Sequence, residues 1–164
     1  MPATVSIHSY HGAAGATEAA VTAIRFKKAD NDTADTNNRM PIPAAGTEYS
    51  YIKHLSLYAD TSPAALIDTL KLYGDGALPT GVQMYVVDAT YTNPVANADA
   101  ALGTWSNNYA GYTSAAPLSI AGSIANPTTG KIQTNYAKMQ MGVISTAAAG
   151  IMTAETLTFS YLES

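Results

Sequence analysis

The fold is decided by residues 49–76, which read YSYIKHLSLYADTSPAALIDTLKLYGDG. The stretch contains two β-patterned runs, from Tyr49 to Tyr58 and from Ile67 to Tyr73. In the first run alternate residues share a face, as in a strand whose successive side chains point to opposite sides of a sheet. The second run closes at the turn Gly74-Asp75-Gly76. The stretch therefore predicts two β-strands.

The same alternation recurs outside this stretch. We expect further strands at about Val5–His8, Val21–Lys28, Gly81–Thr92, Lys138–Val143 and Ile151–Tyr161, and one or two short strands between Asn93 and Thr129, including Leu118–Ile124. Helical patterns are limited to Ser62–Ile67 and Asn97–Leu102, each shorter than the roughly 12–15 residues that an isolated helix needs.

These patterns predict an all-β protein with little helix. Six or seven clear strands with Gly, Pro and Asn between them indicate an antiparallel β-sandwich. A jelly-roll-like arrangement of about eight strands fits the length better than an immunoglobulin-type sandwich of about 100 residues. At 164 residues, we expect residues 1–164 to form a single domain.

The composition excludes several classes of protein. The net charge is −4 and only 12% of residues are charged, whereas a nucleic-acid-binding surface needs clustered Lys and Arg. The absence of cysteine rules out disulfides and thiolate metal sites. Met1–Val5 lacks the pattern of a signal peptide, and no run approaches the roughly 20 apolar residues of a membrane span. We therefore expect a soluble chain made in a cytoplasm, with neither nucleic acid nor membrane as its partner.

The acidic loop that precedes the two strands is the best candidate for a metal site. Asp30, Asp32 and Asp35 supply oxygen ligands of the kind that calcium prefers. The spacing fails the EF-hand pattern, because Ala34 stands at the third ligand position and no closing glutamate follows. A turn that hydrogen-bonds its own backbone explains the loop as well. We expect a structural turn and no cofactor, with calcium as the alternative.

Catalytic patterns are lacking. A strand would place His8 and His11 on opposite faces, and surface or hydrogen-bonded strand positions are the default for these residues and for His54. The chain contains neither a Gly-x-Ser-x-Gly elbow nor a phosphate-binding glycine loop with its lysine. We therefore do not expect an enzyme.

Aromatic residues offer a second type of site. The chain has 11 tyrosines and one tryptophan, and the best exposed platform is Trp105 with Tyr109 and Tyr112 close behind it. Such rings can stack on sugars, or they can anchor a loop or a subunit interface, where aromatics are enriched. We favour the anchor or interface interpretation, with glycan contact as the alternative.

One family resemblance covers roughly residues 21–92. It lies in Ile24–Asp30, in Asp35–Asn38 leading to Pro43–Thr47, and in the two strands up to Gly76, followed by a Gly-Val-x-Met-Tyr-Val strand and Thr90-Tyr91. This pattern resembles small virion proteins of tailed bacteriophages. The resemblance implies a capsid-associated β-sandwich of the decoration or cementing type, without enzymatic activity.

The resemblance sets the functional expectation. We expect a structural protein on the capsid surface of a virion, synthesised in the host cytoplasm, that binds the major capsid protein as a homo-oligomer, with a trimer favoured. The low share of charged residues suits such contacts, because few charges need desolvation. The alternatives are a glycan-binding β-sandwich module, tail-associated or extracellular, and a self-assembling filament subunit.

Overall fold

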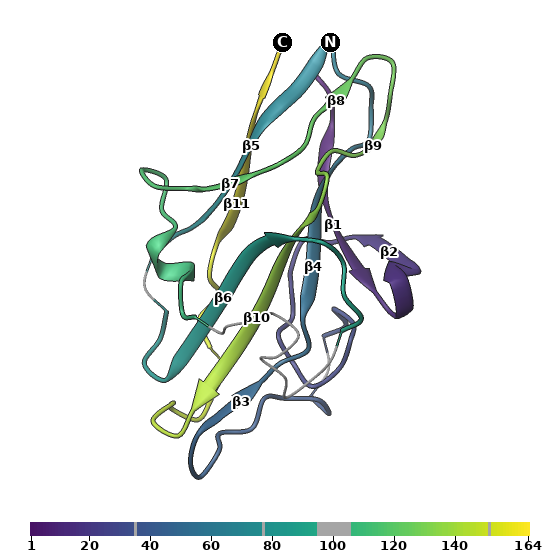
Figure 1. Ribbon diagram of the computed structural model, residues 1–164. Helices are drawn as coiled ribbons and strands as arrows, with labels where there is room; N and C mark the ends of the chain where they lie inside the picture. Colours follow the sequence, from purple (N-terminus) through teal and green to yellow (C-terminus); the bar gives the residue numbers. More distant parts are fainter. Residues whose placement is uncertain (35, 77, 95–105, 151) are drawn as a thin grey trace.

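The computed structural model describes residues 1–34, 36–76, 78–94, 106–150 and 152–164 (Figure 1). This part of the chain forms eleven β-strands in two antiparallel sheets, with two short 3-10 turns, η1 (Ala13–Gly15) and η3 (Tyr109–Gly111). The predicted all-β sandwich with little helix is confirmed. The strands exceed the expected eight because several short ones, of two to four residues, leave no clear alternation in the sequence.

The larger sheet, sheet A, has seven strands in the order β2-β1-β4-β10-β3, with β6 also paired to β10 and β9 to β4. Its members are β1 (Val5–His11), β2 (Thr17–Ala20), β3 (Thr47–Tyr49), β4 (Lys53–Ala59), β6 (Val82–Ala89), β9 (Gly130–Lys131) and β10 (Tyr136–Ile144). The pairing of β10 with β6 is continuous from Tyr136↔Ala89 to Val143↔Val82.

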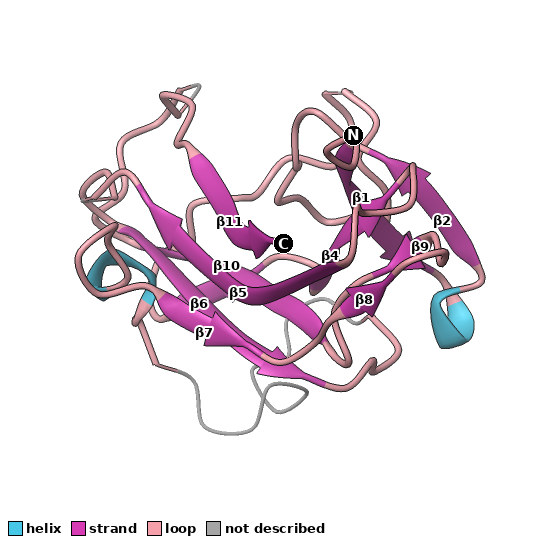
Figure 2. Cartoon of the chain, turned by 90° about the horizontal axis from the view of Figure 1, so that it is seen from above, coloured by secondary structure: helices cyan, strands magenta, loops and turns pink. Residues whose placement is uncertain are grey.

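The smaller sheet, sheet B, has four strands in the order β11-β5-β7, with β8 also paired to β5. Its members are β5 (Leu66–Gly74), β7 (Leu118–Ile120), β8 (Ile124–Ala125) and β11 (Leu157–Glu163). β11 lies at one edge of sheet B, beside β5, and Figure 2 shows the strands of both sheets from above.

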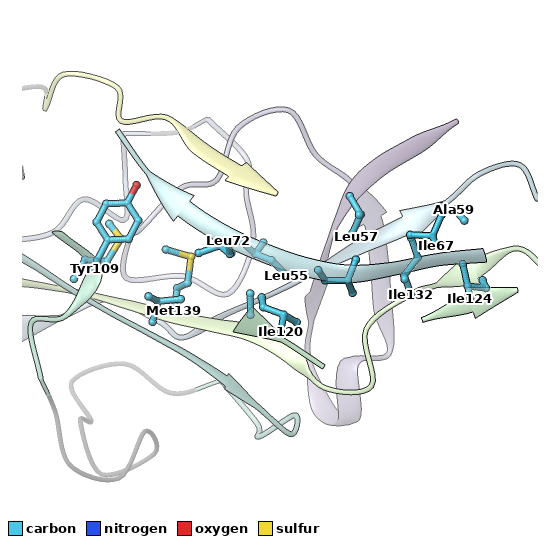
Figure 3. Packing of buried hydrophobic residues seen from close by; sticks show 14 residues of the cluster. Leu55, Leu57, Ala59, Ile67, Leu72, Tyr109, Ile120, Ile124, Ile132 and Met139 are labelled. Atoms are coloured by element: carbon cyan, nitrogen blue, oxygen red, sulfur yellow. The ribbon is translucent and has the colours of Figure 1, made fainter. Parts of the chain in front are cut away.

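The core lies between the inner faces of the two sheets (Figure 3). Leu55 and Leu57 of β4, Leu72 of β5 and Met139 of β10 are at most 3% exposed. Burial of each such side chain contributes about 1.5–3 kcal/mol. The alternation read from the sequence therefore marks the inward faces of β4 and β10 correctly.

One predicted strand is wrong. Residues 21–28 are irregular, although Ile24 and Phe26 pack against the core as their alternation requires. The backbone N–H of Lys28 donates to Asn38 O, across a loop, rather than to a neighbouring strand. Alternation here reflects burial of every second side chain, without a partner strand to complete a ladder.

Other predicted strands also differ in their bounds, and two of them differ most. The run from Tyr49 to Tyr58 is broken at residues 50–52, which separate β3 from β4. The last strand begins at Leu157, after Glu155, whereas we expected it to begin at Ile151, which lies outside the described residues. Residues 62–67 form no helix, and the proposed turn at Asn97–Leu102 also lies outside the described residues. Among the residues that the structure describes, no helix has the length and apolar character to cross a bilayer.

Candidate functional site

A buried cluster of charged side chains joins the acidic loop to sheet A. His11 ends β1, Lys53 begins β4, and Asp30 and Asp32 come from the loop of residues 27–38, here called the polar loop. His11 Nδ1 lies 3.1 Å from Asp30 Oδ1, and His11 Nε2 lies 3.0 Å from Asp32 Oδ2. Lys53 Nζ lies 3.2 Å from Asp32 Oδ1, and the Lys53 side chain is fully buried. Two carboxylates thus face one imidazole and one ammonium group.

Lysine side chains also bind the backbone of the polar loop. Lys53 Nζ donates to Asn31 O over 2.7 Å, and Lys27 Nζ donates to Thr33 O over 2.7 Å. Asp30 Oδ2 accepts the backbone N–H of Gly12, and Asp32 Oδ1 accepts that of Arg25. The carbonyl and carboxylate oxygens that a calcium ion would need are therefore turned toward ammonium, imidazole and amide groups of the chain itself.

The three aspartates proposed as calcium ligands do not all lie in this cluster. Asp30 and Asp32 lie together in the charged cluster, whereas Asp35 lies outside the described residues. No group of three or more His, Cys, Asp or Glu side chains in the described ranges has a geometry that could hold a metal ion. The structural turn that we expected from the loop's Asx residues is present in part, since Asn31 Oδ1 accepts the N–H of Thr33.

The cluster shifts the ionisation of its members. Burial disfavours the charged form of Asp32, but the hydrogen bond from His11 and the charge of Lys53 outweigh it, so the pKa of Asp32 lies well below its usual range. The hydrogen bond to Asp32, against burial, raises the pKa of His11. Burial lowers the pKa of Lys53, and the nearby Asp32 partly offsets that effect.

Ser9, His11 and Asp30 have the connectivity of a hydrolytic triad, but not its chemistry. Ser9 Oγ lies 3.2 Å from His11 Nε2, and the opposite ring nitrogen faces Asp30. The same Nε2 also lies 3.0 Å from Asp32 Oδ2, and this carboxylate raises the pKa of His11, which favours the protonated ring over one that could act as a base toward Ser9. Ser9 is 0% exposed, so a substrate cannot reach its hydroxyl. We interpret the cluster as a set of structural contacts that hold the polar loop against β1 and β4.

A layer of rings covers part of the outer face of sheet A, the face turned away from sheet B. His54 lies 4.1 Å, centroid to centroid, from the ring of Tyr91, and Tyr136 meets both rings at steep angles. His54 is 0% exposed, and its Nε2 accepts the backbone N–H of Thr92 over 3.3 Å. Burial, assisted by the charge of Lys138, lowers the pKa of His54 to about 3. The ring is therefore neutral at physiological pH.

We predict that His54 makes the fold sensitive to acid. The unfolded chain binds a proton at this residue below pH ~6.5, but the folded chain does not bind one until pH falls to about 3. Stability conferred by the neutral ring is thus present above pH ~6.5 and falls with pH by up to about 1.4 kcal/mol per unit. Urea unfolding of the wild type and of His54→Phe between pH 7 and 4 measures this slope. Parallel slopes for the two proteins would contradict the assignment.

The three aromatic residues proposed as a contact site differ in their positions and burial. Tyr109, in η3, is 2% exposed; its ring packs over Gly74, and its hydroxyl donates to Thr156 O over 3.2 Å. Burial raises its pKa to about 12. Tyr112 is half-buried, packs against the core, and accepts the N–H of Gly74 at its carbonyl. Trp105 lies outside the described residues. The ring of Tyr109 is therefore part of the core and offers a glycan no surface, whereas the interface or glycan contact of Trp105 and Tyr112 stays a prediction.

Sequence reasoning missed Lys53 as a member of the cluster and treated His11 as a surface or strand histidine. One sequence feature points to them. In a chain with few charges, a lysine at the start of an apolar strand that follows an acidic loop must be paired if it is buried. That feature cannot identify the partner, which depends on how the loop folds back on β1 and β4.

Comparisons with known proteins add no relative: no protein-family model, curated protein or solved structure matches the chain.

Proposed function

We propose that the chain is a structural protein of a tailed-bacteriophage virion, which binds the capsid surface and stabilises the shell as an oligomer. The observation that carries the proposal is the use made of the buried charges. They fix the polar loop to the sandwich, and the Ser9 hydroxyl beside them is buried rather than open to a substrate. A loop held in one conformation loses little entropy when it binds, which favours a role in adhesion.

The segment that follows the polar loop supplies a contact side chain. Ile42 lies between Pro41 and Pro43 and is 41% exposed, one of three large hydrophobic side chains at the described surface that are at least this exposed. Both prolines restrict the backbone beside it. In this proposal Ile42 inserts into an apolar depression of the major capsid protein.

Co-sedimentation with isolated capsids of the encoding phage tests the proposal. We expect the wild-type protein to bind, and Ile42→Asp to bind at least about tenfold more weakly, because a charge would enter an apolar contact. Leu162→Asp is the matched control: Leu162 is 62% exposed and lies in β11, so its replacement should leave capsid binding unchanged. Failure of the wild type to bind capsids would refute the proposal, as would glycan-array binding as its sole activity.

A further inference from the structure

An apolar groove lies between β1 and β11. It has a volume of about 470 Å³; Val5 and Ile7 line one wall, Phe159 and Tyr161 the other, and Leu57 of β4 contributes between them. None of the residues that line it is charged. Leu57 is buried in the core, whereas Val5, Ile7, Phe159 and Tyr161 pack against the core and are only half-buried. Of the described residues, Figure 2 shows loops but no strand between β11 and β1.

The edge of β11 that is not paired with β5 lies beside this groove. Leu66 and Ser164 exchange both of their backbone hydrogen bonds, which fixes the alternation along β11. The N–H and C=O groups of Phe159 and Tyr161 therefore point away from β5. The N–H of Gly74, opposite Leu157, donates to Tyr112 O and not to β11, as this alternation requires. Among the described residues no strand pairs with β11 on that side.

Between Leu157 and Leu162, the edge of β11 lacks the charged side chains and the proline that usually protect an edge against strand addition. Natural edge strands are blunted by charged side chains, proline or bulges that twist them away. From Leu157 to Leu162 the strand has no charge and no proline, and its irregular step falls on the β5 side, next to Thr69. The carboxylate of Glu163, at the strand end, is bound by the N–H groups of Ala3 and Ala64.

Beside the groove, sheet A has more strands than sheet B, and this difference limits what can pair with β11. Beyond β4, sheet A continues through β1 and β2, whereas sheet B ends at β11. A second copy would bring its own seven-stranded sheet A to this edge together with its β11. One extended segment brings no such sheet. The position beside β11 therefore suits a single added strand.

We propose that the groove between β1 and β11 binds one extended, uncharged segment of a partner protein, which adds a strand to the edge of β11. The N–H and C=O groups of Phe159 and Tyr161 bond its backbone, and alternate apolar side chains of the segment enter the groove beside Ile7. The lining contains no group to pair a charge, so a segment with a charged residue at an inward position is rejected. This inference does not depend on the virion assignment.

A capped synthetic peptide, Ac-Thr-Val-Thr-Phe-Thr-Val-Thr-NH2, serves as the probe, and Ac-Thr-Lys-Thr-Lys-Thr-Lys-Thr-NH2 is its charged counterpart. Fluorescence anisotropy measures binding, and amide hydrogen exchange followed by NMR locates it. We expect the first peptide alone to bind. It should slow exchange at the amides of Phe159 and Tyr161 by roughly tenfold or more, while those of Ser160 and Leu162, which face β5, change little.

Two groove variants and one control complete the test. Ile7→Lys places a charge in the groove and should weaken peptide binding by about tenfold or more. Val21→Lys also places a charge in the groove and should weaken peptide binding, but it lies at the groove margin and should destabilise the fold less than Ile7→Lys does. Leu162→Lys is the matched control, because its exposed side chain alternates with Tyr161 and so points to the other face of β11. The proposal is overturned by no binding, by equal binding of both peptides, or by equal binding to the groove variants and the wild type. Slowing of the same amides by protein concentration alone would also overturn it, because the occupant would then be a second copy.

Discussion

Asp32→Ala is expected to destabilise the protein by about 3–5 kcal/mol, the cost of leaving a buried ion pair with one partner. Lys53 is fully buried and lies 3.2 Å from Asp32, and His11 lies 3.0 Å from it on the other side. Without Asp32, two basic groups share the interior with Asp30 alone. Urea unfolding at pH 6 measures the loss, and hydrogen exchange in residues 27–34 should show the polar loop opening.

Controls separate the pairing from the mere loss of a carboxylate. Asp60→Asn changes an exposed aspartate that accepts a hydrogen bond from Ser6 Oγ, and should alter stability by about 0.5 kcal/mol at most. Lys53→Met combined with Asp32→Ala should cost less than the sum of the two single changes, because the double variant buries no unpaired ammonium. Additive costs, or an equal effect of Asp60→Asn, would show that the cluster contributes nothing specific.

The pH dependence of the Asp32 effect follows from the signs of the shifts. The lowered pKa of Asp32 means that its contribution is present above its unfolded value of about 3.9 and is lost as pH falls through the folded value. The raised pKa of His11 means that its contribution is complete below about 6.5 and is lost as pH rises through the folded value. The difference between the wild type and Asp32→Ala should therefore be largest between about pH 4 and 6.5.

Gly81→Ala is expected to cost about 2–5 kcal/mol through two separate effects. Gly81 has φ of +79°, a conformation that costs a residue with a Cβ about 1–2 kcal/mol. A Cβ at this position would also overlap the backbone of Ala147, which cannot move aside as a flexible side chain could. Such overpacking adds about 1–3 kcal/mol. Thermal or urea unfolding measures the total.

Gly46→Ala isolates the first effect. Gly46 has nearly the same backbone conformation, with φ of +74°, but a Cβ there would meet no atom within 4 Å. We expect this variant to lose only the conformational term, about 1–2 kcal/mol. If the two variants lost equal stability, the close approach of Gly81 to Ala147 would have no energetic consequence.

The strands with strong alternation could be predicted from the sequence, and the meeting of distant polar groups could not. β4, β5, β6 and β10 were each predicted from residues within their own segment. The strand predicted at residues 21–28 was wrong because alternation indicates which side chains are buried, and does not indicate whether a partner strand is present. For the site, the acidic loop was recognised as a turn, but its fastening to His11 and Lys53 was not.

The sequence by itself determined that this chain is an antiparallel β-sandwich with a polar loop before its central strands, because alternation and turn residues act over a few neighbouring positions. Only the tertiary structure decided that Asp32 meets Lys53 and His11 and that the ring of Tyr109 lies in the core. It also decided that no strand of the described residues pairs with the outer edge of β11, beside an apolar groove. These contacts join segments far apart in the chain, and they are set by the packing of one sheet on the other.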